Sequence, residues 1–148
     1  MKKIILFTIL FLFPIIGCFA QSSILVNAES KNPEIVKLQI NCQSKNKKTV
    51  ENDALISAIK IVLFEGVPNT QYSKSLLPIG EKTALQKHEA YFSDLFDNGR
   101  YTDFIKSHKQ LSKFKKADNK GTLFEIEVKI LQLRKDLEEN RVSNKMGY

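Results

Sequence analysis

Residues 36–42 read VKLQINC and residues 122–130 read TLFEIEVKI, and these two stretches decide the fold. In each stretch apolar and polar side chains alternate one by one, which is typical of a strand with one buried face. The first strand would bury Val36, Leu38, Ile40 and Cys42. The second follows a turn at residues 118–121, whose glycine can adopt a positive φ, so we expect residues 110–117 to form the other arm of a hairpin.

Two amphipathic helices are expected between these strands. The first covers residues 49–65, where apolar residues recur at helical spacing, Thr49 can act as the N-cap and Gly66 can provide a left-handed C-cap. The second covers residues 82–96, with one further helical turn near Tyr101, and a short charged helix ends the domain. The sequence therefore predicts an α+β fold: a mainly antiparallel sheet of three or four strands, two main helices packed on one face, and a short C-terminal helix.

The first 20 residues have the pattern of a secretory signal peptide. A basic start, an apolar run over residues 4–16 and a small-residue processing site over residues 17–20 follow one another. The run is shorter than the about 20 residues of a spanning helix, so we expect no transmembrane helix in the mature chain. Cleavage after Ala20 would release the protein to the periplasm or the medium. A lipoprotein-type box would instead make Cys18 the lipidated first residue, anchored to a membrane.

The remaining length fits one modest domain. We expect residues 21–33 to be a polar tether or a marginal strand, residues 34–142 to be a single α+β domain, and residues 143–148 to be a flexible tail. The whole chain has 23 basic and 16 acidic residues. Neither processing route leaves a disulfide partner for Cys42, and we interpret it as a small buried apolar residue rather than a reactive thiol.

The motifs of common catalytic and cofactor sites do not occur. The six glycines form no phosphate-binding loop and no nucleophile elbow. The pair His88-Glu89 lacks the second histidine one turn later that a zinc-protease helix needs, and the acidic group around Asp94 matches no calcium loop. We therefore expect no cofactor, no metal and no enzymatic activity. If the chain were an enzyme, the residues expected to carry out catalysis would lie near the loop over residues 67–80: Glu81, His88, Glu89 and Asp94.

One segment stands out by its charge. Residues 106–120 contain one acidic residue, Asp118, and six lysines: Lys106, Lys109, Lys113, Lys115, Lys116 and Lys120. Such a strip attracts polyanions. In an exported protein these would be lipopolysaccharide, acidic lipids or acidic glycans, and we do not expect nucleic acid. The other interpretation is that the lysines protect an exposed sheet edge from strand addition.

Three stretches, Ala54-Leu55-x-x-Ala58, Gly66-Val67 and FKKADNKGTLFEIEV at residues 114–128, resemble the N-terminal domain of flagellar assembly T proteins and related lipoproteins. The resemblance covers residues 36–66 and 108–137, and residues 67–107 depart from it. It implies a strand leading into an alanine-rich helix, a later hairpin in the same sheet, and a binding or assembly module without catalytic residues.

The leader resembles those of exported proteins from Bacteroidota-type Gram-negative bacteria. Together these features predict an exported, non-enzymatic cell-envelope protein that binds or assembles with another macromolecule, with an envelope protein as the expected partner. The alternative is binding of lipopolysaccharide or an acidic glycan through the strip over residues 106–120.

Overall fold

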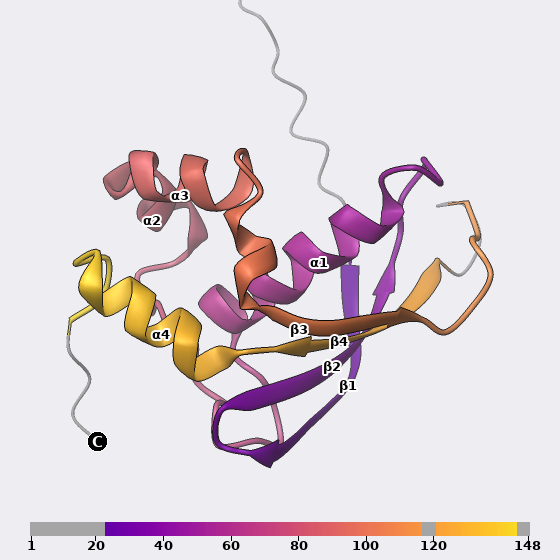
Figure 1. The fold of residues 1–148 in the computed structure, drawn as a ribbon, viewed down its shortest axis with the longest axis horizontal. Coiled ribbons are helices and arrows are strands. Elements are labelled where there is room, and N and C mark those ends of the chain that lie inside the picture. Colours follow the sequence, from indigo (N-terminus) through magenta and orange to yellow (C-terminus); the bar gives the residue numbers. More distant parts are fainter. Residues whose placement is uncertain (1–22, 117–120, 145–148) are drawn as a thin grey trace, which may run out of the picture.

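The structure is a computed structural model that describes residues 23–116 and 121–144. Its centre is a four-stranded antiparallel sheet in the order β1-β2-β4-β3 (Figure 1). The strands are β1 (Ser23–Asn32), β2 (Ile35–Cys42), β3 (Ile105–Gln110) and β4 (Thr122–Val128). The helices are α1 (Val50–Lys60), α2 (Glu81–Lys87), α3 (Glu89–Phe96) and α4 (Ile130–Glu139). The α+β fold expected from the sequence is confirmed.

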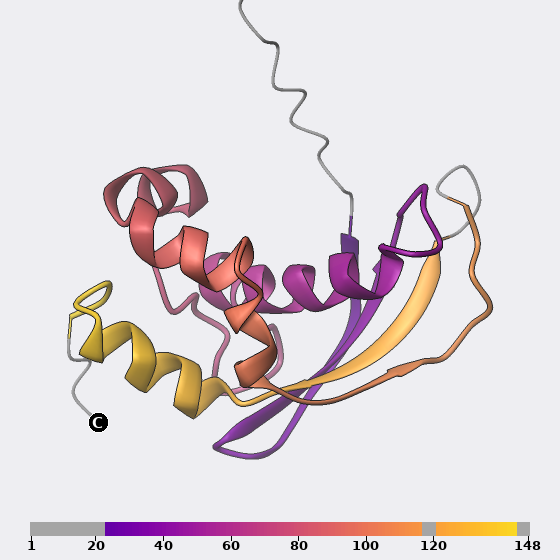
Figure 2. The ribbon, with the colours of Figure 1, turned by 45° about the horizontal axis from the view of Figure 1, so that its top comes forward.

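The two strands that the alternation predicts form the middle of the sheet. Val36, Leu38, Ile40 and Cys42 of β2 are fully buried, and so are the alternate residues of β4 from Thr122 to Val128. The two sets lie opposite one another, with Leu38 paired to Ile126. Helix α1 lies across this buried face (Figures 1 and 2). The intervening side chains therefore point to the outer face of the sheet, away from α1.

Within the segment expected to be a polar tether or a marginal strand, residues 23–32 form strand β1. It pairs with β2 from Ser23 opposite Cys42 to Asn32 opposite Ile35, so the sheet begins before residue 34. A register shift between Leu25 and Asn27 leaves Val26 out of the pairing. Because a bulge interrupts the period of two, the sequence of this strand shows no clear alternation.

The first helix is confirmed, and both of its ends differ from expectation. No side chain caps its N-terminus: the Thr49 hydroxyl donates to Asp53 Oδ2 at 3.1 Å instead of accepting a backbone amide. At the other end the last turn widens into a π-helix, η1 (Ile61–Glu65), closed by the Gly66 N–H donating to the Ile61 carbonyl at 2.8 Å. Gly66 has φ 83° and ψ 170°, so its φ is positive but its conformation is not left-handed helical.

The second helix is divided. His88, with φ −125° and ψ 44°, separates α2 from α3, and α3 lies beside the C-terminal half of α1 (Figures 1 and 2). Phe92 and Leu95 of α3 are buried in the core. The expected further turn is the 3₁₀ helix η2 (Arg100–Phe104), which leads directly into β3.

The prediction for the first arm of the last hairpin is wrong. Residues 110–117 were predicted as the strand, whereas β3 ends at Gln110 and residues 111–116 are irregular. The reason is that β3 is an edge strand whose residues after Ile105 are all exposed, so it carries no apolar alternation. Phe114 packs against the core from this irregular segment.

Candidate functional site

The structure divides the lysines that the sequence groups into one strip. Lys106 and Lys109 lie on β3, at the edge of the sheet, and Lys106 Nζ is 3.5 Å from Glu127 Oε2 on β4. Lysines on an edge strand have the position that protection against strand addition requires. Lys113, Lys115 and Lys116 lie beyond the strand, in the irregular segment, and Lys120 lies outside the described residues.

A second group of lysines lies beside this irregular segment. Residues 43–49 leave β2 at the end of the sheet where Cys42 pairs with Thr122, and Figures 1 and 2 both show this loop near the end of the segment over residues 111–116. Residues 43–49 and 111–116 together contain no acidic residue. Their lysines are all exposed, and none forms an ion pair with a described acidic residue: Lys45, Lys47, Lys48, Lys113, Lys115 and Lys116. We call these six lysines the basic end.

Hydrogen bonds, one of them buried, order the loop over residues 43–49 and hold it to α1. Ser44 is buried, and its hydroxyl donates to Asp53 Oδ2 at 2.8 Å. Asn46 Oδ1 accepts the backbone N–H of Lys48 at 2.9 Å, and the Asn46 carbonyl accepts that of Val50 at 3.1 Å. The backbone that carries Lys45, Lys47 and Lys48 is therefore fixed, which reduces the entropy lost when a ligand binds.

The segment over residues 111–116 is held to β4 in the same way. The backbone N–H of Leu111 donates to the Leu123 carbonyl at 2.8 Å, and that of Lys115 donates to Thr122 Oγ1 at 3.0 Å. Ser112 Oγ accepts the N–H of Leu123 at 2.9 Å. Both halves of the basic end are thus built on backbone that is hydrogen-bonded to the sheet or to α1.

Apolar side chains lie next to the basic end, on the outer face of the sheet. Ile24 is opposite Asn41, which is opposite Leu123, so the three share this face. Ile24 is 53% exposed and Leu111, bonded to Leu123 through its backbone, is 40% exposed. This end of the molecule therefore presents cations and apolar side chains together.

Of the four residues that could carry catalysis, two are held in ion pairs and a third lines a groove. Glu81 is ion-paired with Lys60 at 2.8 Å, and Asp94 Oδ2 accepts the Arg100 Nε–H at 2.5 Å. His88 lies at the break between α2 and α3, and Glu89 lines a groove between α1 and α3 that Lys60 also lines. In residues 23–116 and 121–144, no group of three histidine, cysteine or acidic side chains is placed to hold a metal ion.

The contacts of Cys42 and His108 hold the fold together. Cys42 is fully buried, and this burial raises the pKa of its thiol, which agrees with the interpretation as a core residue. His108 Nε2, on β3, lies 2.7 Å from Glu51 Oε1 on α1. This contact joins the edge strand to the helix that covers the sheet.

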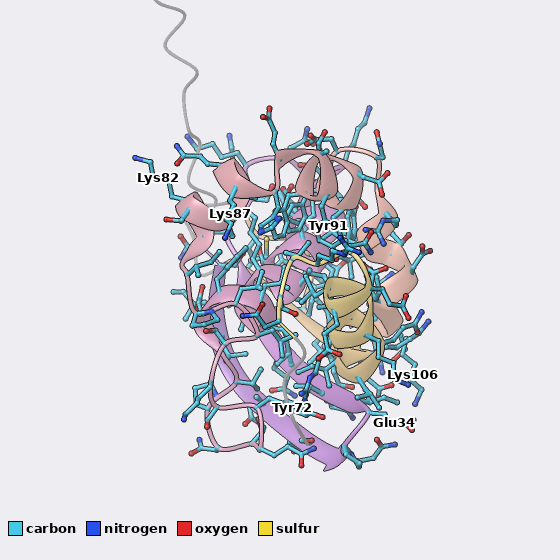
Figure 3. The ribbon with its side chains drawn as sticks, turned by 90° about the vertical axis from the view of Figure 1, so that its left-hand side faces the viewer. Glu34, Tyr72, Lys82, Lys87, Tyr91 and Lys106 are labelled. Carbon is cyan, nitrogen blue, oxygen red and sulfur yellow. The ribbon has the colours of Figure 1, made fainter. Side chains whose placement is uncertain are left out.

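A polar cluster that the sequence did not reveal joins α3, η2 and α4. Arg100 Nη1 donates to Asp136 Oδ1 at 3.0 Å, and the Tyr91 hydroxyl donates to Asp136 Oδ2 at 2.6 Å. Burial, with the adjacent Asp136 carboxylate, raises the pKa of Tyr91. Figure 3 shows Tyr91 beside α4. The partners are far apart in the sequence, so no local spacing marks them, and their arrangement is that of a packing contact between helices.

The chain matches no known family model, no curated protein and no solved structure. The resemblance to flagellar assembly T domains stays a prediction. So do the leader over residues 1–20 and the lipidation of Cys18, which lie outside the described residues. No helix in the part of the chain that the structure describes is long and apolar enough to cross a membrane.

Proposed function

We propose that the chain is an exported, non-enzymatic protein of the cell envelope that binds an anionic macromolecule through its basic end. The observation that carries this proposal is that two segments, far apart in the sequence, place six exposed lysines at one end of the sheet, and neither segment contains an acidic residue. Unneutralised cations in one place attract a polyanion, because each anionic group displaces counterions and meets several ammonium groups.

The neighbouring apolar side chains favour an amphiphilic polyanion. Ile24 and Leu111 are about half exposed next to the lysines, and an acidic glycan has no acyl chain that would contact them. Lipopolysaccharide presents phosphates next to acyl chains, so both parts of this surface would find a partner. A lysine near an anionic lipid surface contributes about 1 kcal/mol, and three of them would change the affinity by about a hundredfold.

The first test removes the charge of one segment at a time. Replacing Lys113, Lys115 and Lys116 with glutamine, or Lys45, Lys47 and Lys48 with glutamine, should weaken binding to lipopolysaccharide by about ten- to a hundredfold. Each triple variant should also make the affinity less dependent on salt, since fewer counterions are released. Titration calorimetry or vesicle sedimentation at several salt concentrations measures both effects.

A variant with the same loss of charge elsewhere provides the control. Lys74, Lys82 and Lys87 are exposed, and Figure 3 shows Lys82 and Lys87 on α2, away from the sheet. Changing these three lysines to glutamine should leave the affinity within about twofold. If this control weakens binding as much as the other two triple variants, net charge accounts for the effect and the basic end is not the site.

An envelope protein is the second candidate partner, and exposed apolar residues of β1 favour it. Val26, at the bulge, is 58% exposed, and such side chains on a sheet edge can contact another protein. Affinity recovery from an envelope fraction should then yield a partner that a Val26→Lys variant fails to retain. Recovery that is equal with the native protein and with the Val26→Lys variant would contradict the role of Val26.

The intact mass of the mature protein from the same preparation distinguishes Gln21 from lipidated Cys18 as the first residue.

A further inference from the structure

A cavity lies at the end of the sheet opposite to the basic end. Its volume is about 330 Å³, and it is bounded by the start of β2, by β3 and by the first turns of α4. Its lining is Glu34, Ile35, Lys106, Lys129, Leu131, Gln132 and Lys135. Figure 3 shows Glu34 and Lys106 near one another beside α4. This volume is at the lower end of the about 300–1,000 Å³ typical of pockets for small ligands.

Three lysines line this cavity, one from β3, one from the N-cap position of α4 and one from α4 itself. Lys129 Nζ donates to the Asp103 carbonyl at 2.9 Å, a neutral acceptor that leaves its charge uncompensated. Lys135, on α4, forms no ion pair with any residue that the structure describes. Glu34 is the single acidic residue in the lining, so the described lining has an excess of two positive charges.

The Lys106 ammonium can bind an anion in the cavity without leaving the Glu127 carboxylate unpaired. It also borders a second cavity of about 190 Å³, whose lining includes Glu127. Glu127 Oε2 accepts the Ser107 hydroxyl at 3.0 Å, and this hydrogen bond is the main cause that lowers the pKa of Glu127. Glu127 therefore keeps a partner if the Lys106 ammonium, 3.5 Å away, turns toward an anion in the larger cavity.

The remaining lining adds an apolar wall. Ile35 and Leu131 are partly buried and offer an aliphatic surface next to the ammonium groups. The cavity also meets the N-terminal end of α4, a ten-residue helix that no side chain caps, so the positive end of its dipole has the same sign as the lysines. A ligand that fills the cavity should thus carry an anionic head and a short apolar body.

We propose that this cavity binds a small amphiphilic anion, with its head group against Lys106, Lys129 and Lys135 and its aliphatic part against Ile35 and Leu131. The head group is a carboxylate or a phosphate monoester, both of which lysine binds as a point charge. This site is separate from the basic end, and it does not depend on the proposed function.

The test is an amide-detected NMR titration of the mature protein with four probes: octanoate, octyl phosphate, octanol and inorganic phosphate. We expect octanoate or octyl phosphate to give saturable shifts at Ile35, Leu131 and Gln132. The tighter of the two identifies the head group. Octanol lacks the charge and inorganic phosphate lacks the apolar body. The affinity for each of them should therefore be lower by about tenfold or more. Equal binding of octanol and octanoate would overturn the proposal, and so would shifts confined to the basic end.

Two double variants complete the test. Lys106→Gln with Lys135→Gln should lower the affinity for the preferred probe by about tenfold or more, since Lys129 alone remains. Lys129 is kept because its ammonium also holds the Asp103 carbonyl. Lys82→Gln with Lys87→Gln removes the same charge on α2, away from both the cavity and the basic end, and should leave the affinity unchanged. The proposal fails if both double variants weaken binding equally, or if neither does.

Discussion

Replacing Gly66 with alanine is expected to destabilise the fold by about 3 kcal/mol or more. With φ 83° and ψ 170°, Gly66 occupies a region that is open almost only to glycine, and a side chain there costs about 1–3 kcal/mol. An alanine Cβ would also lie 2.4 Å from the backbone oxygen of Ser73. The loop that carries Ser73 cannot easily move aside, because Val67 N–H donates to the Tyr72 carbonyl at 2.7 Å.

Gly80 offers a control that separates the two causes. Its φ of 80° and ψ of 152° are close to those of Gly66, but a Cβ on Gly80 would meet no atom within 4 Å. Gly80→Ala should therefore lose only the backbone contribution, about 1–3 kcal/mol, and less stability than Gly66→Ala. Urea denaturation of both variants gives the two free energies of unfolding. Equal losses would mean that the close approach to Ser73 has no energetic effect.

Elements with one buried face could be predicted from the sequence, and elements without one could not. The alternation in β2 and β4 reports directly which side chains are buried, as Leu38 and Phe124 show. Strand β3 has an almost wholly exposed set of side chains, so nothing in its sequence distinguishes it from a loop. In β1 the bulge at Val26 shifts the period, and the pairing with β2 overrides the weak local pattern.

The candidate site could also be predicted only in part, because its residues come together from distant parts of the sequence. The lysines over residues 113–116 and 45–48 are both visible in the sequence, but only the pairing of Cys42 with Thr122 places them at the same end of the sheet. Charge along the chain therefore predicted half of the basic end and grouped it with Lys106 and Lys109, which lie elsewhere. Which charges gather is set by strand register, and register depends on the whole sheet.

Replacing Asp136 with alanine is expected to destabilise the fold by about 2 kcal/mol and to loosen α4 in particular. The carboxylate accepts hydrogen bonds from Tyr91 and Arg100, so its removal leaves a tyrosine hydroxyl and a guanidinium short of partners. A fully buried pair would lose about 3–5 kcal/mol. The Arg100 and Asp136 side chains are 26% and 21% exposed, and solvent screening reduces that figure.

Amide hydrogen exchange along Ile130–Glu139 measures this loosening directly, beside the free energy of unfolding. Asp136→Asn keeps an acceptor for the Tyr91 hydroxyl but loses the charge that Arg100 faces, so it should lie between alanine and the native protein. Glu139→Ala, an exposed change on the same helix, should stay within about 0.5 kcal/mol. If Asp136→Ala were as mild as Glu139→Ala, the apolar contacts of Leu133 and Leu137 would be enough to hold α4, and the cluster would not contribute to its docking.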